Sequence, residues 1–330
     1  MVTNGHNGNF ETYLPTEVID LLFPSSICQS FHNYPYATHG AAIGFFGYND
    51  PLNPTICGGL GNPENGAHSD ECYQLDFEAN EFIANTTEKL FEPRIYSGAS
   101  AIDNNLFFSG GYPLGSNASK TTEVIGRKGE WQNHGPDLPA PLRSHCSVTP
   151  TFLEPSSSPG IWIIGGRTGE SENETYSGEI TSDTLIYFGP QDIDSSWISG
   201  PPLIQGRELH ACEILKYKNS DVIVVAGGRD VNETTLASVE FYDENIGHWI
   251  FGPDLPKPLF EPVMVSFSDS IILVGGTNCI SCPSSKSIYQ LTCENSDLED
   301  CSWIEMDQKL SFGRYGHNAL LIPDNSLTCG

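Results

Sequence analysis

Positive charge is scarce in this sequence. It carries 15 lysine and arginine residues against 42 aspartate and glutamate residues, a formal net charge of −27 at pH 7. A nucleic-acid-binding domain needs a basic patch, and an anionic membrane surface repels a chain of this sign. We therefore expect neither nucleic acid nor a membrane as a partner. Two interpretations of the acidity stay open, namely simple solubility and attraction to a cationic partner.

Long apolar runs are also lacking. No segment approaches the roughly 18 consecutive apolar residues that cross a bilayer as a helix. Residues 1–13 are polar, and the short apolar patch at 18–23 is interrupted by Asp20. That patch is too short for the core of a signal peptide. We therefore expect neither membrane insertion nor a secretion signal in these residues.

The common catalytic motifs are missing as well. The sequence has no Gly-x-Ser-x-Gly elbow, no phosphate-binding loop, no His-Glu-x-x-His pair and no calcium-binding loop. Pairs of acidic residues occur, but they fall in expected loops without partners. The sequence thus predicts a protein that is not an enzyme and that needs no cofactor or metal ion.

Glycine and proline, by contrast, are abundant, with 33 and 23 residues. They separate short apolar runs rich in β-branched and large side chains, which is typical of strands bounded by turns. One type of run ends in a glycine pair and recurs at intervals of about 50 to 60 residues. Its instances lie at 55–59, 106–111, 161–166, 222–228 and 271–276, with a clipped version at 326–330.

A second strand follows each glycine pair, and a tryptophan follows that strand in four units. The second strands are expected at 72–77, 122–126, 184–188, 238–242 and 287–291, and the tryptophans are Trp131, Trp197, Trp249 and Trp303. An aromatic residue at a fixed place in a repeat is expected in the core, where it packs one sheet on the next. With an apolar strand before each glycine pair, every unit has four strands, which we name a to d.

This order of strand, glycine pair, second strand and tryptophan resembles the kelch repeat. The resemblance implies an all-β fold, a single six-bladed kelch β-propeller over residues 1–330. Blades 1 to 5 are expected at about 36–92, 93–140, 141–204, 205–257 and 258–311. The last blade is expected to be closed by N-terminal strands c and d (16–35) pairing with C-terminal strands a and b (312–330), and residues 1–15 are expected to be flexible. Closure of this kind removes open sheet edges.

Basic residues recur just before strand a of several units. They are Arg94, Arg143, Arg207 and Arg314, and the last three precede the histidines His145, His210 and His317. This placement resembles the kelch substrate receptors of cullin ubiquitin ligases, which implies that the four arginines form a ring that binds a protein partner. Arginine suits that task because it can bind a carboxylate through two parallel hydrogen bonds. The alternative is that the arginines brace adjacent blades through buried ion pairs, and the histidines are expected to be structural.

Ten cysteines suggest disulfide bonds. The candidate partners are Cys293 with Cys301, which flank a polar turn, and Cys57 with Cys72, which bracket a b–c loop. Cys279 and Cys282 could form half of a zinc site, but the sequence has no second Cys-x-x-Cys motif. Several cysteines could instead be small buried hydrophobic residues.

Four Asn-x-Ser/Thr sequons mark candidate glycosylation sites at Asn85, Asn117, Asn173 and Asn232. Together with the cysteines they favour an extracellular, secreted protein. The sequence thus predicts a monomeric interaction module that binds a protein partner of unknown identity through its loops. One alternative is an intracellular adaptor of the actin-binding or ubiquitin-ligase type, located in the cytoplasm. The other is a carbohydrate-directed or copper enzyme resembling galactose oxidase, to which Tyr315-Gly-His317 is a weak likeness without an adjacent Tyr-His pair.

Overall fold

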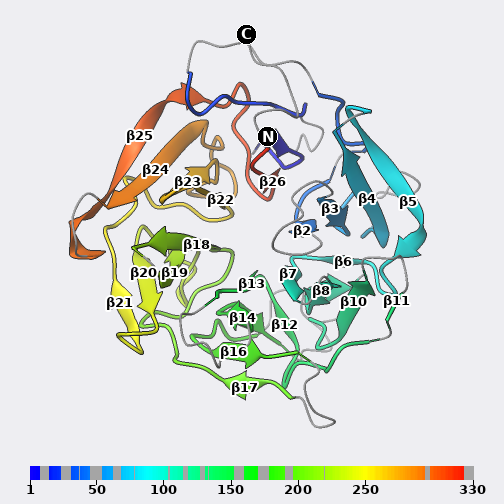
Figure 1. Cartoon of the computed structure of the whole chain (residues 1–330), viewed down its shortest axis with the longest axis horizontal. Helices are drawn as coiled ribbons and strands as arrows, with labels where there is room; N and C mark the ends of the chain where they lie inside the picture. The colour runs from blue at the N-terminus through cyan, green and yellow to red at the C-terminus, as the bar shows by residue number, and fades with distance from the viewer. Residues whose placement is uncertain are drawn as a thin grey trace.

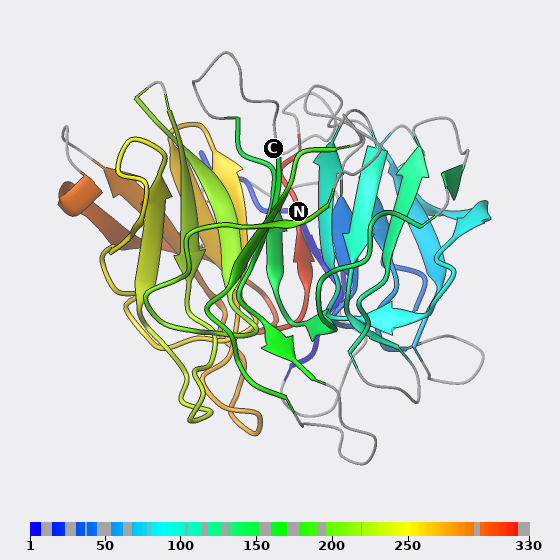
Figure 2. The same ribbon diagram turned by 90° about the horizontal axis from the view of Figure 1, so that it is seen from below.

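The computed structural model describes residues 1–7, 15–23, 31–36, 38–44, 54–61, 68–77, 79–102, 105–113, 118–126, 131–132, 134–151, 160–169, 178–189, 196–218, 220–293 and 298–322. Within these ranges the chain forms β-strands and one 3-10 turn, η1 (Leu298–Asp300). No helix in them is long and apolar enough to cross a membrane. The sheets stand around a central axis, viewed end on in Figure 1 and from the side in Figure 2. The fold is an all-β propeller.

Five antiparallel sheets of four strands form blades 1 to 5, and in each the strands follow one another in chain order. Blade 1 contains β2 (Ala42–Gly44), β3 (Thr55–Cys57), β4 (Glu71–Asp76) and β5 (Glu81–Lys89). Blade 2 contains β7 (Gly98–Ile102), β8 (Asn105–Ser109), β10 (Thr122–Gly126) and β11 (Trp131–Gln132). Blade 3 contains β13 (Cys146–Val148), β14 (Ile161–Ile164), β16 (Thr184–Tyr187) and β17 (Ile198–Ser199). Blade 4 contains β18 (Ala211–Tyr217), β19 (Ser220–Ala226), β20 (Val239–Asp243) and β21 (Trp249–Phe251). Blade 5 contains β22 (Val263–Phe267), β23 (Ser270–Val274), β24 (Ser287–Cys293) and β25 (Cys301–Lys309).

Each of these sheets lies inside the residue range expected for its blade. The strand that ends in a glycine pair is the buried one, as in β19, where residues 222–226 are fully buried because neighbouring blades cover both faces of the sheet. Gly227 and Gly228 follow with φ angles of 68° and 94°, which residues with a Cβ rarely adopt. A Cβ at Gly227 would also lie 2.3 Å from the carbonyl oxygen of Leu259. The glycine pair therefore turns the chain and lets the next segment approach closely.

The tryptophans of strand d join neighbouring blades. Each indole Nε1 donates a hydrogen bond to the carbonyl of a proline that leaves the preceding blade. The bonds are Trp197 to Pro136 (2.9 Å), Trp249 to Pro201 (2.9 Å) and Trp303 to Pro253 (3.1 Å). The expected packing of one blade on the next is confirmed for these three residues, whereas the side chain of Trp131 lies outside the described part of the structure.

Residues 2–3 and residues 318–319 meet in a smaller sheet, which we call the terminal sheet. β1 (Val2–Thr3) pairs antiparallel with β26 (Asn318–Ala319), and Val2 also forms a bridge with Glu17. The terminal sheet lies between blade 5 and blade 1 (Figure 1). Gln308 of β25 connects it to blade 5, because its side chain donates to the carbonyls of Asp20 (3.1 Å) and Leu21 (3.0 Å).

This arrangement corrects two expectations about the termini. Residues 1–15 were expected to be flexible, but residues 2 and 3 form a buried strand. That strand lies between β26 and Glu17, in the place that was expected for residues 326–330. Residues 326–330 themselves fall outside the described ranges. The expected strand d is not found at residues 31–36, which form no strand. Asn4 and Gly5, with φ angles of 66° and 100°, reproduce the turn of a glycine pair, because asparagine tolerates the left-handed region better than most residues.

Six backbone hydrogen bonds form a closed circuit around the axis, which we call the axial circuit. Its members each precede an innermost strand, and all have φ angles between 50° and 64°. The N–H groups donate from Gly40 to Gly316, Gly316 to Glu261, Glu261 to Leu209, Leu209 to Ser144, Ser144 to Tyr96 and Tyr96 to Gly40, over 2.7–3.3 Å. The circuit therefore connects the five blades and the terminal sheet at one end of the axis.

Candidate functional site

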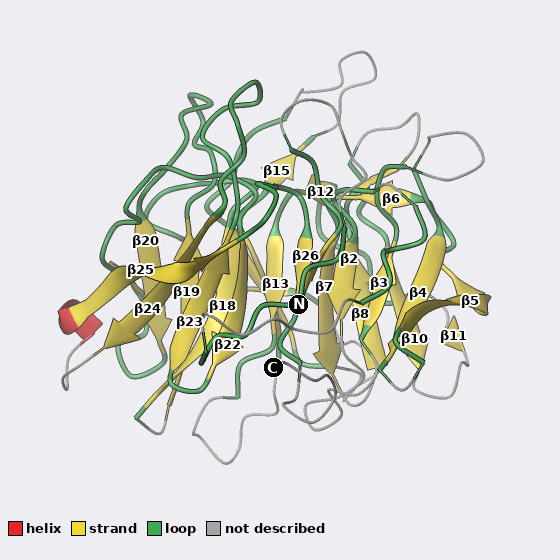
Figure 3. Ribbon diagram, turned by 90° about the horizontal axis from the view of Figure 1, so that it is seen from above, coloured by secondary structure: helices red, strands yellow, loops and turns green. Residues whose placement is uncertain are grey.

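The face that carries the axial circuit also carries the loops between strands b and c and between strands d and a. We call it the axial face, and it lies at the upper end of Figure 3. Two short sheets border it. β6 (Arg94–Ile95) pairs with β9 (Tyr112–Pro113), and β12 (Leu142–Arg143) pairs with β15 (Arg167–Thr168). Segments before strand a thus lie beside the residues that follow a glycine pair.

All four arginines predicted to bind a partner are buried, Arg143 with 8% exposure and the other three with 0%. Arg207 is 0% exposed and donates to Glu240 Oε1 (2.7 Å) and to the Gly227 carbonyl (2.9 Å). Glu240, also 0% exposed, accepts the backbone N–H groups of Ile204 (2.7 Å) and Gln205 (3.0 Å) as well. Both charges are therefore satisfied inside blade 4, where the ion pair fixes the segment that enters the blade.

The same unit, which we call a brace, occurs twice more. Arg94 pairs with Glu123 and donates to the Gly110 carbonyl over 2.7 Å. Arg314 pairs with Glu17 and donates to the Asn4 carbonyl over 3.0 Å. Arg94 and Arg314 are also 0% exposed. The structure thus corrects the predicted ring of four arginines, because a guanidinium enclosed with its own glutamate is not presented to a partner. These three arginines instead fit the alternative in which they form buried ion pairs that brace the blades.

Arg143 differs from the braces by one residue in register. In each brace the arginine precedes the axial-circuit residue by two positions, but Arg143 directly precedes Ser144. Leu142 takes the brace position, and strand c of blade 3 has Leu185 where the braces have glutamate. Arg143 therefore lies on the axial side of the blade as a buried side chain, 8% exposed, with its guanidinium over the ring of Tyr112, 5.4 Å from the centroid.

Two arginines that the sequence prediction missed share this face. Arg167 donates through Nε and Nη2 to the two oxygens of Glu208, both at 2.9 Å. Arg229 pairs with Glu208 and with Glu233, each at 3.1 Å, and Arg167 also contacts Glu233. Two cations and two carboxylates thus form one network. Its signal in the sequence is Gly-Gly-Arg, which occurs twice.

Five aromatic and imidazole rings lie beside this network, and we call them the axial arc. In order they are Phe260, Tyr315, His6, His39 and Tyr96, with neighbouring centroids 6.2, 5.0, 5.9 and 6.2 Å apart. Burial lowers the pKa of His39 to about 4 and also lowers the pKa of His6. Both imidazoles are therefore neutral at pH 7.

Glu261, a member of the axial circuit, places its carboxylate among these rings. Its Oε1 accepts a hydrogen bond from the Tyr96 hydroxyl (3.4 Å), and its Oε2 is buried without a hydrogen-bond partner among the described residues. A Cβ at Gly316 would lie 2.5 Å from that Oε2. Burial raises the pKa of Glu261 to about 7, while Arg229 acts in the opposite direction. A perturbed carboxylate with an unused acceptor is the feature of this face best suited to a ligand.

The three repeated histidines serve the fold. Burial lowers the pKa of each to about 3, so they are neutral at pH 7. A Cβ at the first glycine of the adjoining pair would lie 2.6–3.0 Å from the imidazole Cε1, and these contacts are His145 with Gly110, His210 with Gly165 and His317 with Gly275. Across the described ranges, no group of three or more His, Cys, Asp and Glu side chains is arranged to hold a metal ion.

A cavity of about 740 Å³ lies along the axis, below the axial circuit. The innermost strands line it, mostly with small residues such as Ala42, Gly98 and Ser147. Glu213 is its acidic member, and burial raises the pKa of that carboxyl to about 6. Its lining begins directly after the axial circuit, since Ser97, His145 and His317 each follow a member of the circuit.

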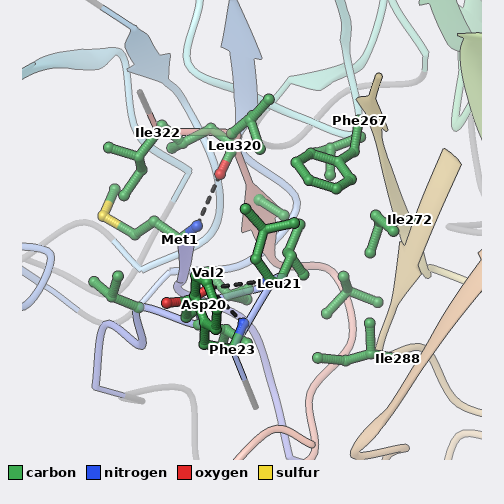
Figure 4. A pocket seen from close by; sticks show the side chains of 17 residues that line it. Met1, Val2, Asp20, Leu21, Phe23, Phe267, Ile272, Ile288, Leu320 and Ile322 are labelled. Atoms are coloured by element: carbon green, nitrogen blue, oxygen red, sulfur yellow. Dashed lines mark hydrogen bonds between the residues drawn. The ribbon is translucent and has the colours of Figure 1, made fainter. Parts of the chain in front are cut away.

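A second, apolar cavity of about 370 Å³ lies between the terminal sheet and blade 5 (Figure 4). Val2 and Leu21 line one side of it, and Ile272 and Ile288 line the other. The N-terminal amino group donates to the Leu320 carbonyl over 2.8 Å at its edge. These residues belong to the apolar contact that joins the terminal sheet to blade 5, so we assign the cavity to packing.

Four disulfides are present in the described residues. The two predicted ones are found, Cys57–Cys72 and Cys293–Cys301, each between directly paired residues of adjacent strands. Two were not predicted: Cys146–Cys212, which joins the innermost strands of blades 3 and 4, and Cys279–Cys282. The last bond occupies both thiols of the zinc half-site considered from the sequence.

Among the four sequon asparagines, only the side chain of Asn232 lies within the described part of the structure. It is exposed in the loop between β19 and β20, as glycosylation requires. Asn117 and Asn173 lie outside the described ranges, and the side chain of Asn85, within β5, does so as well.

The comparisons with known proteins support the fold. No protein-family model matches the chain. Among solved structures, the chain is similar to that of YjhT, with a TM-score of 0.65 and 12% sequence identity over 84% of this chain and 87% of the other. At this level of identity the likeness shows the β-propeller fold alone, and it transfers no activity.

Proposed function

We propose that this chain is a six-bladed, kelch-type propeller whose axial face binds a protein partner without catalysing a reaction. The observation that carries the proposal is the axial arc around Glu261, supported by the axial circuit. A support with little freedom favours binding because less conformational entropy is lost. Arginine and aromatic residues, which this face combines, also dominate the energetics of protein interfaces.

The sixth blade of this proposal is the terminal sheet. Its support is the brace between Arg314 and Glu17, which repeats at the chain ends the pairing seen in blades 2 and 4. The axial circuit adds to it, because Gly316 and Gly40 continue the same hydrogen-bond pattern across the junction. If the ring is closed, Glu17→Gln should lower the stability of the whole propeller in one cooperative transition, and Glu123→Gln and Glu240→Gln should do the same.

We also propose an extracellular, oxidising location for a monomeric protein. The four disulfides support it, since such bonds persist in oxidising compartments. Non-reducing peptide mapping of protein from its native source should find these bonds, and a glycosidase should increase its electrophoretic mobility. Replacing Asn232 by glutamine should reduce that shift by one glycan. Free thiols and no glycan would favour the intracellular adaptor instead.

The experiment that tests the binding face compares captured proteins by quantitative mass spectrometry. Arg143→Glu changes the axial face, and Asp269→Lys changes an exposed turn between β22 and β23 at the opposite end of the strands. We expect a specific partner to be lost with Arg143→Glu and kept with Asp269→Lys. Loss with Asp269→Lys alone would place the site on the opposite face.

A further inference from the structure

The charges around the axial arc do not all cancel. Arg167 and Arg229 are matched by Glu208 and Glu233 in one network. Glu261 lies beside that network, but among the described residues no ion pair joins its carboxylate to a cation, and its Oε2 has no hydrogen-bond partner. A buried carboxylate without a counter-charge is costly in its ionised form. A cationic group from outside would remove that cost.

The rings of the axial arc attract the same kind of group. The faces of tyrosine and phenylalanine draw a cation that lies within about 6 Å of the centroid. The chain already contains one example, because the guanidinium of Arg229 lies 5.0 Å from the Phe260 centroid. His6 and His39 add no competing positive charge, since burial lowers both pKa values. Burial also raises the pKa of Tyr315 to about 12, so it adds no negative charge either.

The free acceptor discriminates between the two cationic side chains. Oε1 of Glu261 is occupied by the Tyr96 hydroxyl, which leaves Oε2. Arginine favours two parallel bonds to both oxygens of a carboxylate, whereas the lysine ammonium is a compact charge that needs one acceptor. The absence of a side chain at Gly316 keeps the space beside Oε2 free of a Cβ.

We therefore propose that the axial arc and Glu261 bind a lysine ammonium group of the protein partner. The inference rests on the proposed function and names the chemistry of its binding face. The net charge of −27 agrees with it, because a chain of this sign attracts basic partners.

Binding should strengthen as the pH rises through about 7, because Glu261 must be ionised to pair with the ammonium group. The other groups that face this carboxylate are Tyr96, Tyr315, His6, His39, Arg229 and Glu208. Burial lowers the pKa values of the two histidines, that of His39 to about 4. The pH dependence between 6 and 8 therefore reports on Glu261.

The test uses a short Gly/Ser peptide with one lysine, acetylated at its N-terminus and amidated at its C-terminus, titrated into the full chain by NMR. The same peptide with acetyl-lysine or arginine serves as the comparison. Glu261→Gln removes the counter-charge, and Asp269→Asn makes the same charge change on an exposed turn. Tyr315→Leu removes a ring of the arc, with circular dichroism as the check on folding.

We expect saturable binding of the lysine peptide that weakens at least about tenfold with acetyl-lysine and with Glu261→Gln, and hardly at all with Asp269→Asn. The proposal is overturned if no saturation occurs up to roughly 10 mM peptide or if the arginine peptide binds better than the lysine peptide. It is also overturned if Glu261→Gln and Asp269→Asn weaken binding equally. A captured partner that depends on Arg143 but tolerates Glu261→Gln would reject the lysine site and leave the binding function standing.

Discussion

Two groups of arginines in this propeller have different partners, although Arg143 and Arg167 of the second group are also buried, at 8% and 6% exposure. Those of the braces, Arg94, Arg207 and Arg314, are fully enclosed and each pairs with a glutamate. Those of the axial face, Arg143, Arg167 and Arg229, lie among aromatic rings and acidic side chains near the axis. What separates Arg143 from Arg207 is one position relative to the axial circuit. The comparison teaches that in a repeat protein a shift of one residue decides whether an arginine forms a brace inside a blade or lies at the axial face. We call the blades with their braces the frame.

The largest expected effect is the loss of a brace. Glu240→Ala leaves Arg207 buried without its carboxylate and should lower the free energy of unfolding by about 3–5 kcal/mol. The matched control is Glu233→Ala on the axial face, whose side chain is 51% exposed and whose removal should cost below about 1 kcal/mol. Urea unfolding measures both. Equal losses would remove the distinction between frame and face.

Disulfides extend the same comparison. Cys146–Cys212 joins two blades across 66 residues, whereas Cys279–Cys282 spans three residues in an exposed loop. Loop closure restricts the unfolded chain more for the longer loop. Replacing both partners by serine should therefore cost about 4 kcal/mol for the first bond and about 2 kcal/mol or less for the second, read from urea midpoints. A larger loss for the second bond would mean that the loop around it supports the frame.

The frame was largely predictable from the sequence because its signals repeat. The strands that end in glycine pairs, the tryptophans and two of the disulfides follow from patterns that recur or from cysteines that face each other across a turn. Cys146 and Cys212 gave no such signal, since both lie in strand a of different blades and only the ring arrangement brings them together. Asn4-Gly5 was missed because it replaces the glycine pair with a different residue in the same conformation.

The axial face was less predictable because its residues do not repeat. The axial circuit contains two glycines, a tyrosine, a serine, a leucine and a glutamate, which share a backbone conformation but no side-chain chemistry. Their common register appears once the hydrogen bonds are known, and without it Arg143 looks like a fourth brace. Glu261 and His39 carried no sequence signal at all, because each occurs at its position in one blade alone.

A smaller, pH-dependent effect is expected at Glu261. Its pKa of about 7 lies above the unfolded value of 4.5, so the folded chain retains a proton that the unfolded chain releases. This favourable contribution is complete below about pH 4.5 and is lost as the pH rises through 7. Glu261→Gln should therefore stabilise the protein by about 1–3 kcal/mol at pH 8.5 and hardly at pH 4.5.

Thermal unfolding of the purified protein at the two pH values measures this difference. Asp269→Asn, on an exposed turn, is the control and should show no comparable change between them. An equal gain at both pH values for Glu261→Gln would show that the carboxylate is not the source, and it would also weaken the lysine site.

The smallest expected effect on stability, and the sharpest comparison, is Arg143→Met. Methionine keeps much of the side-chain volume, so the substitution mainly removes the charge and its position over Tyr112. A cation over an aromatic ring contributes from about 0.5 kcal/mol at an exposed site to about 2 kcal/mol when desolvated, and Arg143 is 8% exposed. Arg207→Met leaves the buried Glu240 without its cation and should cost about 3–5 kcal/mol. A double-mutant cycle with Tyr112→Leu isolates the ring contribution. If Arg143→Met proves as costly as Arg207→Met, Arg143 belongs to the frame in spite of its register, and the axial face loses the one predicted arginine that reaches it.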